Sequence, residues 1–213
     1  IVERDLRLAE LTGVHYHVSN VSTKETVEVI KRAKLNGIKI TCDTSPPYFS
    51  LNELELSTYD TSFKLSPPLR NEEDRIAIQN AIFDDTIDII TSDHKPMSND
   101  TKILPFTSAS TGASGIETLL PLTLNLLNKS DVSIMNILKK ITLNPSKLLK
   151  VEIPKIKSNE KANFIIFDPN EQYLINKDSL QTSPTPFHGR PVQGKNYMSM
   201  MNGEIVFDNL DLL

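Results

Sequence analysis

An acid and a histidine follow a short apolar run in the middle of the chain. Residues 87–91 read as a buried strand, and Asp93 and His94 come directly after it. Parallel α/β folds place their chemistry where strands end. Asp93 is therefore the first candidate for a metal ligand or a general base. It needs partners elsewhere in the chain, because zinc sites use three or more protein ligands.

The four histidines supply few such partners. His15 and His17 alternate along an expected strand and so share one face, where they are either metal ligands or polar residues at a strand edge. His94 would point to the face opposite Asp93 if the strand continued through it. His188 is expected on the surface. No combination of these residues predicts a complete metal cluster.

Hydrophobic periodicity predicts alternating strands and helices over the first two thirds of the chain. Strands are expected at 14–18, 38–42, 62–65 and 87–91. Helices are expected at 2–11, 22–36, 72–83, 115–127 and 133–142, with a further short helix opened by Asn144–Pro145. Ser22 and Glu25 have the spacing of a capping box for the second helix. Cys42 lies on a β-branched strand and is expected to be a small core residue rather than a nucleophile.

The parallel alternation predicts an α/β fold for residues 1–150. Its four expected strands are half of an eight-stranded barrel, since a closed (β/α)₈ domain takes about 250 residues. A small open α/β sheet is the alternative. Residues 151–213 predict a small β-rich domain, with strand-like runs at 162–168 and 197–208 and an Asn202–Gly203 hairpin turn in the second.

Composition narrows the class of protein. The net charge of -4 comes without basic clusters, which disfavours a nucleic-acid partner. No apolar run approaches the roughly 20 residues that span a bilayer, so no membrane partner is expected. The single cysteine excludes an internal disulfide and fits a reducing, cytoplasmic location. The chain begins at Ile1 without Met, which predicts a processed or truncated product.

Five sequence segments, taken in their order along the chain, resemble those of a known family. They are His17–Glu25, Lys64–Arg75, Thr86–Pro96, Gly115–Thr118 and Asn144–Pro145. In this order and spacing the chain resembles the carboxyl-terminal half of a class I dihydroorotase of the cyclic amidohydrolase family. The match spans essentially the whole chain.

The resemblance implies half of an amidohydrolase (β/α)₈ TIM-type barrel plus part of a small β-sandwich. The other half of the barrel, with the family's His-x-His metal motif, would lie before Ile1. Members of this family open and close dihydroorotate in pyrimidine biosynthesis and use one or two zinc ions to make hydroxide. Asp93 matches the acid that serves there as metal ligand and proton shuttle.

Two metal-ligand positions of the family are altered in this chain. Asn20 stands before Val-Ser-Thr, where the family has a histidine, and Pro47 stands at the first histidine of a Thr-Pro-His-His string. Proline has no ligand atom, and an asparagine amide replaces imidazole poorly on zinc. We therefore expect no zinc, or at most one ion.

Substrate-contact positions differ as well. Ser66 replaces an asparagine before Pro-Pro-Leu-Arg, and Met97 replaces the histidine that closes the Asp-His-x-Pro-His motif. Gly112 matches the loop that meets the pyrimidine ring, but Thr111 stands where an aromatic residue usually precedes it. These losses favour a protein that has given up catalysis.

Three hypotheses follow. The first is a non-catalytic dihydroorotase homologue that acts as a structural partner, for which the family precedent is a pseudo-subunit assembled with aspartate transcarbamoylase. The second is a one-metal dihydroorotase or related cyclic amidohydrolase, completed by an amino-terminal half. The third is a binding module that keeps the barrel for another ligand. An open half-barrel exposes strand edges, so each predicts pairing with another chain.

Overall fold

A three-stranded parallel sheet lies at the centre of the first part of the chain. The computed structural model describes residues 1–176 and 184–210. The strands β1 (Tyr16–Val18), β2 (Ile40–Thr44) and β3 (Ile89–Ile90) lie in the order β1-β2-β3. Both pairings are parallel, so the carboxyl ends of all three strands meet at one edge of the sheet.

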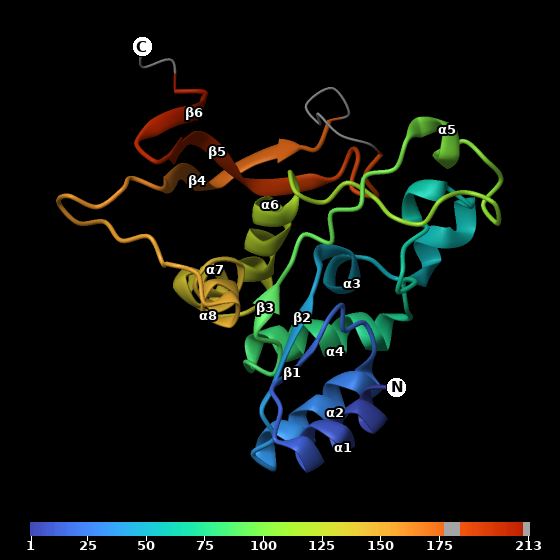
Figure 1. Ribbon diagram of the computed structural model, residues 1–213. Helices are drawn as coiled ribbons and strands as arrows, with labels where there is room; N and C mark the ends of the chain where they lie inside the picture. Colours follow the sequence, from blue (N-terminus) through green and yellow to red (C-terminus); the bar gives the residue numbers. More distant parts are fainter. Residues whose placement is uncertain (177–183, 211–213) are drawn as a thin grey trace.

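Helices pack against this sheet as the periodicity predicts. Figure 1 shows α1 (Val2–Thr12), α2 (Lys24–Leu35) and α4 (Glu72–Phe83) side by side on one side of the strands. The helix α7 (Ile134–Ile141) contacts β3, and α8 (Leu143–Leu149) follows it. These helices lie close to their expected ranges, which confirms the prediction.

The predicted capping box at the start of α2 is wrong. Thr23, not Ser22, is the N-cap, and its side chain accepts a hydrogen bond from the Thr26 backbone N–H. Either hydroxyl can cap a helix, and sequence spacing alone could not decide between the adjacent residues. The helix α4 begins in the same way at Asn71, whose side chain accepts from the Asp74 N–H.

The main core lies between the parallel sheet and its helices. Its fully buried side chains come from every layer and include Ile30, Cys42, Ile78, Ile82, Ile87 and Ile137. Burial raises the pKa of the Cys42 thiol to about 12. The thiol is therefore protonated at neutral pH, and the prediction of a core cysteine is confirmed.

Two expected elements of the first part are wrong. Residues 62–65 form no strand: the short 3-10 helix η2 (Thr61–Phe63) stands there, begun by Asp60, whose side chain accepts from the Ser62 N–H. The parallel sheet in the described ranges thus has three strands rather than four. The helix expected at 115–127 is shorter, consisting of α6 (Leu119–Leu124) and the 3-10 helix η3 (Asn125–Lys129).

A second, antiparallel sheet follows the helices. It contains β4 (Phe164–Leu174), β5 (Pro191–Met201) and β6 (Glu204–Asp208), in that order. The expected Asn202–Gly203 turn joins β5 and β6, with both residues at positive φ (53° and 88°). β5 packs on α6, and the Gln193 backbone N–H donates to Asn125 Oδ1 at 3.2 Å.

Apolar side chains remain exposed on the antiparallel sheet. They are Phe164, Ile165, Ile166, Leu174, Met201, Ile205, Val206 and Phe207. The division of the chain at residue 150 stays a prediction. The chain before β5 is rich in Pro and Ser over residues 183–191, of which residue 183 lies outside the described residues. No helix within residues 1–176 and 184–210 is long and apolar enough to cross a bilayer.

Candidate strand-end site

The carboxyl ends of the parallel strands bring three polar residues together. Asn20 follows β1, Asp43 lies near the end of β2, and Asp93 follows β3. Asn20 and Asp93 both adopt positive φ (55° and 45°), so each leaves the direction of its strand. The chain therefore turns at this edge and aims side chains across the strand ends.

The Asp93 side chain is nearly buried and forms an ion pair with a lysine of the same chain. Its side chain is 11% exposed, and Lys95 Nζ lies 2.8 Å from Asp93 Oδ1. The Asn20 side-chain amide donates to the same oxygen at 3.2 Å. The acid predicted from sequence is therefore held by an ammonium and an amide that both belong to this chain.

Asp43 forms a second, linked cluster. Asp43 Oδ1 accepts from the Asn20 backbone N–H at 2.8 Å, and Asp43 Oδ2 lies 2.9 Å from His17 Nε2. His17 Nδ1 and His15 Nε2 both lie within hydrogen-bond distance of Thr41 Oγ1, at 2.7 and 3.1 Å. The two histidines thus share a face, as predicted. Both ring nitrogens of His17 have protein partners, which favours the polar strand-edge alternative.

The short helix α3 (Pro46–Ser50) covers the site and carries Pro47. Pro47 is buried, and with Asp93 it lines a hollow of about 10 Å³, roughly the space of a single water. The neighbouring Tyr48 hydroxyl donates to the Pro67 carbonyl oxygen at 2.9 Å. Burial raises the pKa of Tyr48, and the nearby Asp93 charge raises it further. Tyr48 is therefore a neutral hydrogen-bond donor, not a base.

The segment carrying Asp93 is clamped against the loop before α6. The backbone N–H groups of Gly115 and the next residue donate to His94 Nδ1 at 3.3 and 3.2 Å. A Cβ atom added at Gly112 would lie 2.8 Å from the Lys95 carbonyl oxygen. A Cβ atom added at Gly115 would overlap the Ser92 carbonyl oxygen. β3 ends at Ile90, so the strand does not continue through Asp93 and the condition for His94 to point opposite Asp93 is not met.

The expected substrate-contact residues lie around this loop but do not converge on Asp93. Met97 lies beside Gly112, since its Cε would be 3.2 Å from an added Cβ there. Ser66 is exposed and precedes a cis peptide bond to Pro67, and Thr111 is half-buried. Within the described residues no hydrogen bond joins Ser66 or Thr111 to Asp93. His188 is exposed, as predicted.

Two residues of this site were missed by the sequence reasoning. Asp43 could have been found from its alternation with Thr41 on one strand, which places both on the face of the histidines. Lys95 follows Asp93 by two residues, a spacing that places two side chains on one face of an extended segment. This spacing could have indicated the ion pair.

The comparisons with known proteins identify the family. The sequence model of the amidohydrolase family matches residues 2–206. The chain belongs to the amidohydrolase family. It is 37% identical over 210 residues to the dihydroorotase of Anaplasma phagocytophilum, which covers 97% of this chain and 47% of that protein. It is 38% identical over 209 residues to the dihydroorotase of Acetivibrio thermocellus, covering 97% of this chain and 49% of that one.

A solved structure gives the same result for the fold. The amidohydrolase chain superposes on the L-hydantoinase (dihydropyrimidinase) from Arthrobacter aurescens with a TM-score of 0.89 and 26% identity. That match covers 100% of this chain and 49% of the hydantoinase. The chain thus spans about half the length of the amidohydrolases that it matches, and its fold is a mixed α/β fragment of theirs.

Amidohydrolases typically use zinc, and the strand-end residues of this chain do not fit that ion. The Pro47 side chain has no atom that can bind a metal, and both ring nitrogens of His17 lie within hydrogen-bond distance of Asp43 or Thr41. Asn20 Oδ1 is buried without a hydrogen-bond partner among the described residues, so it and Asp93 are the remaining donors. Two ligand residues fall short of the three or four of a zinc site. Residues 1–176 and 184–210 contain no group of three or more His, Cys, Asp or Glu that could hold a metal.

Proposed function

We propose that this chain is a dihydroorotase-like amidohydrolase of pyrimidine biosynthesis that does not catalyse at its own strand-end site. Its role is that of a structural partner in an assembly, with aspartate transcarbamoylase as the expected partner. The dihydroorotases to which it is similar support the substrate class. The chemistry of the site supports the loss of catalysis.

One observation carries the proposal: the Lys95 ammonium lies on Asp93. A zinc-activated hydroxide needs an unoccupied carboxylate as ligand or proton acceptor. Here that carboxylate is neutralised by a cation of its own chain. Asn20 supports this arrangement, since its amide N–H donates to Asp93 where an imidazole of the family would face the metal.

The role as a partner is supported by surfaces that this chain leaves uncovered. In the described part of the protein β1 and β3 each pair with β2 alone, so each keeps one unpaired edge. The antiparallel sheet also exposes a row of apolar side chains that includes Ile165, Val206 and Phe207. Unpaired edges and exposed apolar patches of this kind mark interaction surfaces, which either the rest of an amidohydrolase barrel or a separate partner chain would cover.

Turnover of dihydroorotate tests the proposal. We expect no zinc-dependent turnover by this chain, either alone or with aspartate transcarbamoylase from the same cell. The triple variant Asn20→His, Pro47→His, Lys95→Ala restores two imidazoles and frees Asp93, and it should gain zinc that the parent chain does not hold. Turnover by the parent that depends on Asp93 would contradict the proposal. Failure to co-elute with aspartate transcarbamoylase would remove that partner.

A second candidate is a one-metal enzyme completed by another segment with a His-x-His motif. It is favoured by Asp93, which lies at the strand ends where such a ligand belongs. It requires Lys95 to leave Asp93 when the metal binds. Asp93→Ala would then abolish activity of the completed protein, whereas an unchanged rate would exclude this candidate.

A further inference from the structure

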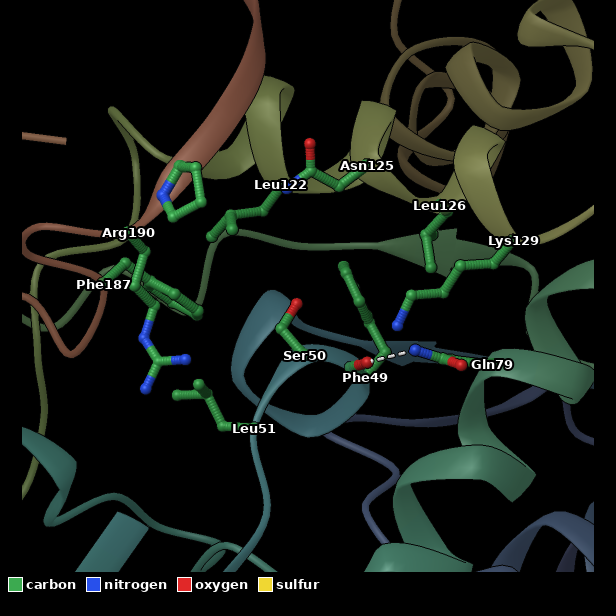
Figure 2. A pocket seen from close by; sticks show the side chains of 11 residues that line it. Phe49, Ser50, Leu51, Gln79, Leu122, Asn125, Leu126, Lys129, Phe187 and Arg190 are labelled. Carbon is green, nitrogen blue, oxygen red and sulfur yellow. Dashed lines mark hydrogen bonds between the residues drawn. The ribbon is translucent and has the colours of Figure 1, made fainter. Parts of the chain in front are cut away.

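A second cavity lies behind α3, away from Asp93. Its volume is about 240 Å³, and α3, α4, α6, η3 and the segment before β5 enclose it. Figure 2 shows the side chains that line it. Phe187 lines both this cavity and the small hollow at Asp93, so it separates the two spaces.

The walls of this cavity combine buried apolar side chains with several polar ones. Its five largest apolar lining residues are each 3% exposed or less: Phe49, Leu51, Leu122, Leu126 and Phe187. A cavity of about 150 Å³ lined in this way binds benzene, while pockets for drug-sized ligands begin at roughly 300 Å³. A volume between these values fits one ring or a branched apolar group with a small substituent.

One cation at the mouth of the cavity lacks a partner. Lys129 is exposed as a residue, but Figure 2 shows its side chain pointing over the mouth toward Phe49 and Gln79. Within the described residues its ammonium has no hydrogen bond or ion pair. Burial lowers the pKa of Lys129, Arg75 lowers it further, and Glu72 opposes both. An ammonium in this position gains from an anionic ligand.

Two other polar side chains that line the cavity, Gln79 and Arg190, have protein partners. Gln79 and Arg75 both donate to the Phe49 carbonyl oxygen, at 2.6 and 3.3 Å. Arg190 is paired with Glu55 at 2.7 Å. Of the two cations that line the cavity, Arg190 has an ion-pair partner, and Lys129 has none among the described residues.

We infer that this cavity binds a small organic anion, a compact aromatic or branched apolar body with one carboxylate. The body packs on Phe49 and Leu126, and the carboxylate meets the Lys129 ammonium. This goes beyond the proposed function, because it needs neither a metal nor the strand-end acid. It gives the chain a ligand site whether or not it turns over dihydroorotate.

Titrations followed by ¹³C-methyl spectra of the leucines test the inference. The probes are benzoate, benzyl alcohol and acetate, added to the 213-residue chain. Benzoate should shift the methyl signals of Leu51, Leu122 and Leu126 in a saturable manner. Benzyl alcohol lacks the charge and acetate lacks the ring, so each should bind about tenfold more weakly or worse, a difference of about 1.4 kcal/mol.

Two variants and a control locate the site. Lys129→Gln keeps much of the aliphatic part of the side chain but removes the ammonium, and it should weaken benzoate binding about tenfold. Ser50→Leu places a larger side chain in the cavity and should abolish the binding. Lys157→Gln removes the same charge from an exposed loop and should leave binding unchanged.

Three outcomes would overturn the inference. They are absence of saturable benzoate binding, shifts confined to leucines outside the cavity, and equal binding by Lys129→Gln and Lys157→Gln. Dihydroorotate turnover does not enter any of these readouts. The inference can therefore fail while the proposed function stands, and the reverse.

Discussion

The two spaces on either side of α3 differ in volume and in whether their charged side chains are paired. The hollow at Asp93 measures about 10 Å³, and its acid is paired with Lys95 and Asn20. The cavity behind α3 measures about 240 Å³, and its Lys129 ammonium has no ion-pair partner among the described residues. The space where the amidohydrolase family places its chemistry is closed, while the neighbouring one remains open.

The difference between the two spaces shows that an inherited position in the fold does not by itself provide room for a ligand. Most polar groups at the strand ends pair with one another, with Asn20 Oδ1 as an exception, which leaves little capacity for a ligand. The cavity behind α3 is lined by buried apolar side chains and a few polar ones, including the Lys129 cation, which is the usual composition of a small-molecule site. A position at the carboxyl ends of parallel strands is therefore insufficient to assign function to this chain.

The largest expected effect comes from Phe49, which lines the cavity behind α3. Phe49 is 1% exposed and packs in the main core. Phe49→Ala should lower the free energy of unfolding by about 3–5 kcal/mol, since it removes buried contacts and enlarges the cavity. Urea denaturation measures this change. Leu54→Ala, at a side chain that is 75% exposed, serves as the control and should stay within about 0.5 kcal/mol.

Gly115→Ala should break the clamp on the Asp93 side. The added methyl group overlaps the Ser92 carbonyl oxygen, and this backbone atom cannot move away without shifting the segment. We expect a loss of about 1–3 kcal/mol in unfolding free energy. Gly37→Ala meets no neighbouring atom within 4 Å but adopts φ +77°, so it should cost about 1 kcal/mol through the backbone alone. Equal losses in the two variants would argue against the clamp.

Lys95→Met tests the pairing that closes the strand-end site. Lys95 is 47% exposed, so solvent screens the ion pair, and we expect a loss of about 1 kcal/mol or less. Asp93→Asn removes the other charge. In the double variant the two losses should not add, because both remove the same interaction. Strict additivity in the double-mutant cycle would mean that Lys95 does not hold Asp93.

The smallest expected effect concerns the acid next to the open cavity. Hydrogen bonds from Arg75 and Asn52 lower the pKa of Glu72 from 4.5 to about 2. Since the folded pKa lies below the unfolded one, this contribution is complete above pH 4.5 and is lost as the pH falls toward 2. Glu72 is 49% exposed, so we expect less than about 1 kcal/mol. Glu72→Gln should flatten the stability-pH curve between pH 4.5 and 2, and an unchanged slope would contradict this assignment.

Sequence reasoning predicted those elements whose signals are local. The apolar stripe Val27, Ile30 and Ala33 defines α2, and the Asn202–Gly203 pair defines the hairpin of the second sheet. The strand expected at 62–65 failed because a local capping interaction of Asp60 outweighed the alternation of a few residues. Short strands carry too few residues for their period to override such a turn.

The candidate site was predicted only in part. Asp93 and Asn20 were identified from the sequence segments around them, and in the structure their side chains form a hydrogen bond. The Lys95 contact was missed, although the spacing of two residues from Asp93 is compatible with it. The cavity behind α3 could not be predicted, since residues such as Phe49, Lys129 and Phe187 are far apart in the chain.

Zinc binding to the purified chain tests the central claim most directly. Equilibrium dialysis against micromolar zinc, followed by metal analysis, compares the parent chain with Asp93→Ala and with Lys95→Ala. The account predicts no zinc that depends on Asp93 in the parent chain, and the same residual metal content in Asp93→Ala. One equivalent of zinc in the parent chain that Asp93→Ala loses would show that Lys95 gives way to a metal, and would contradict the account.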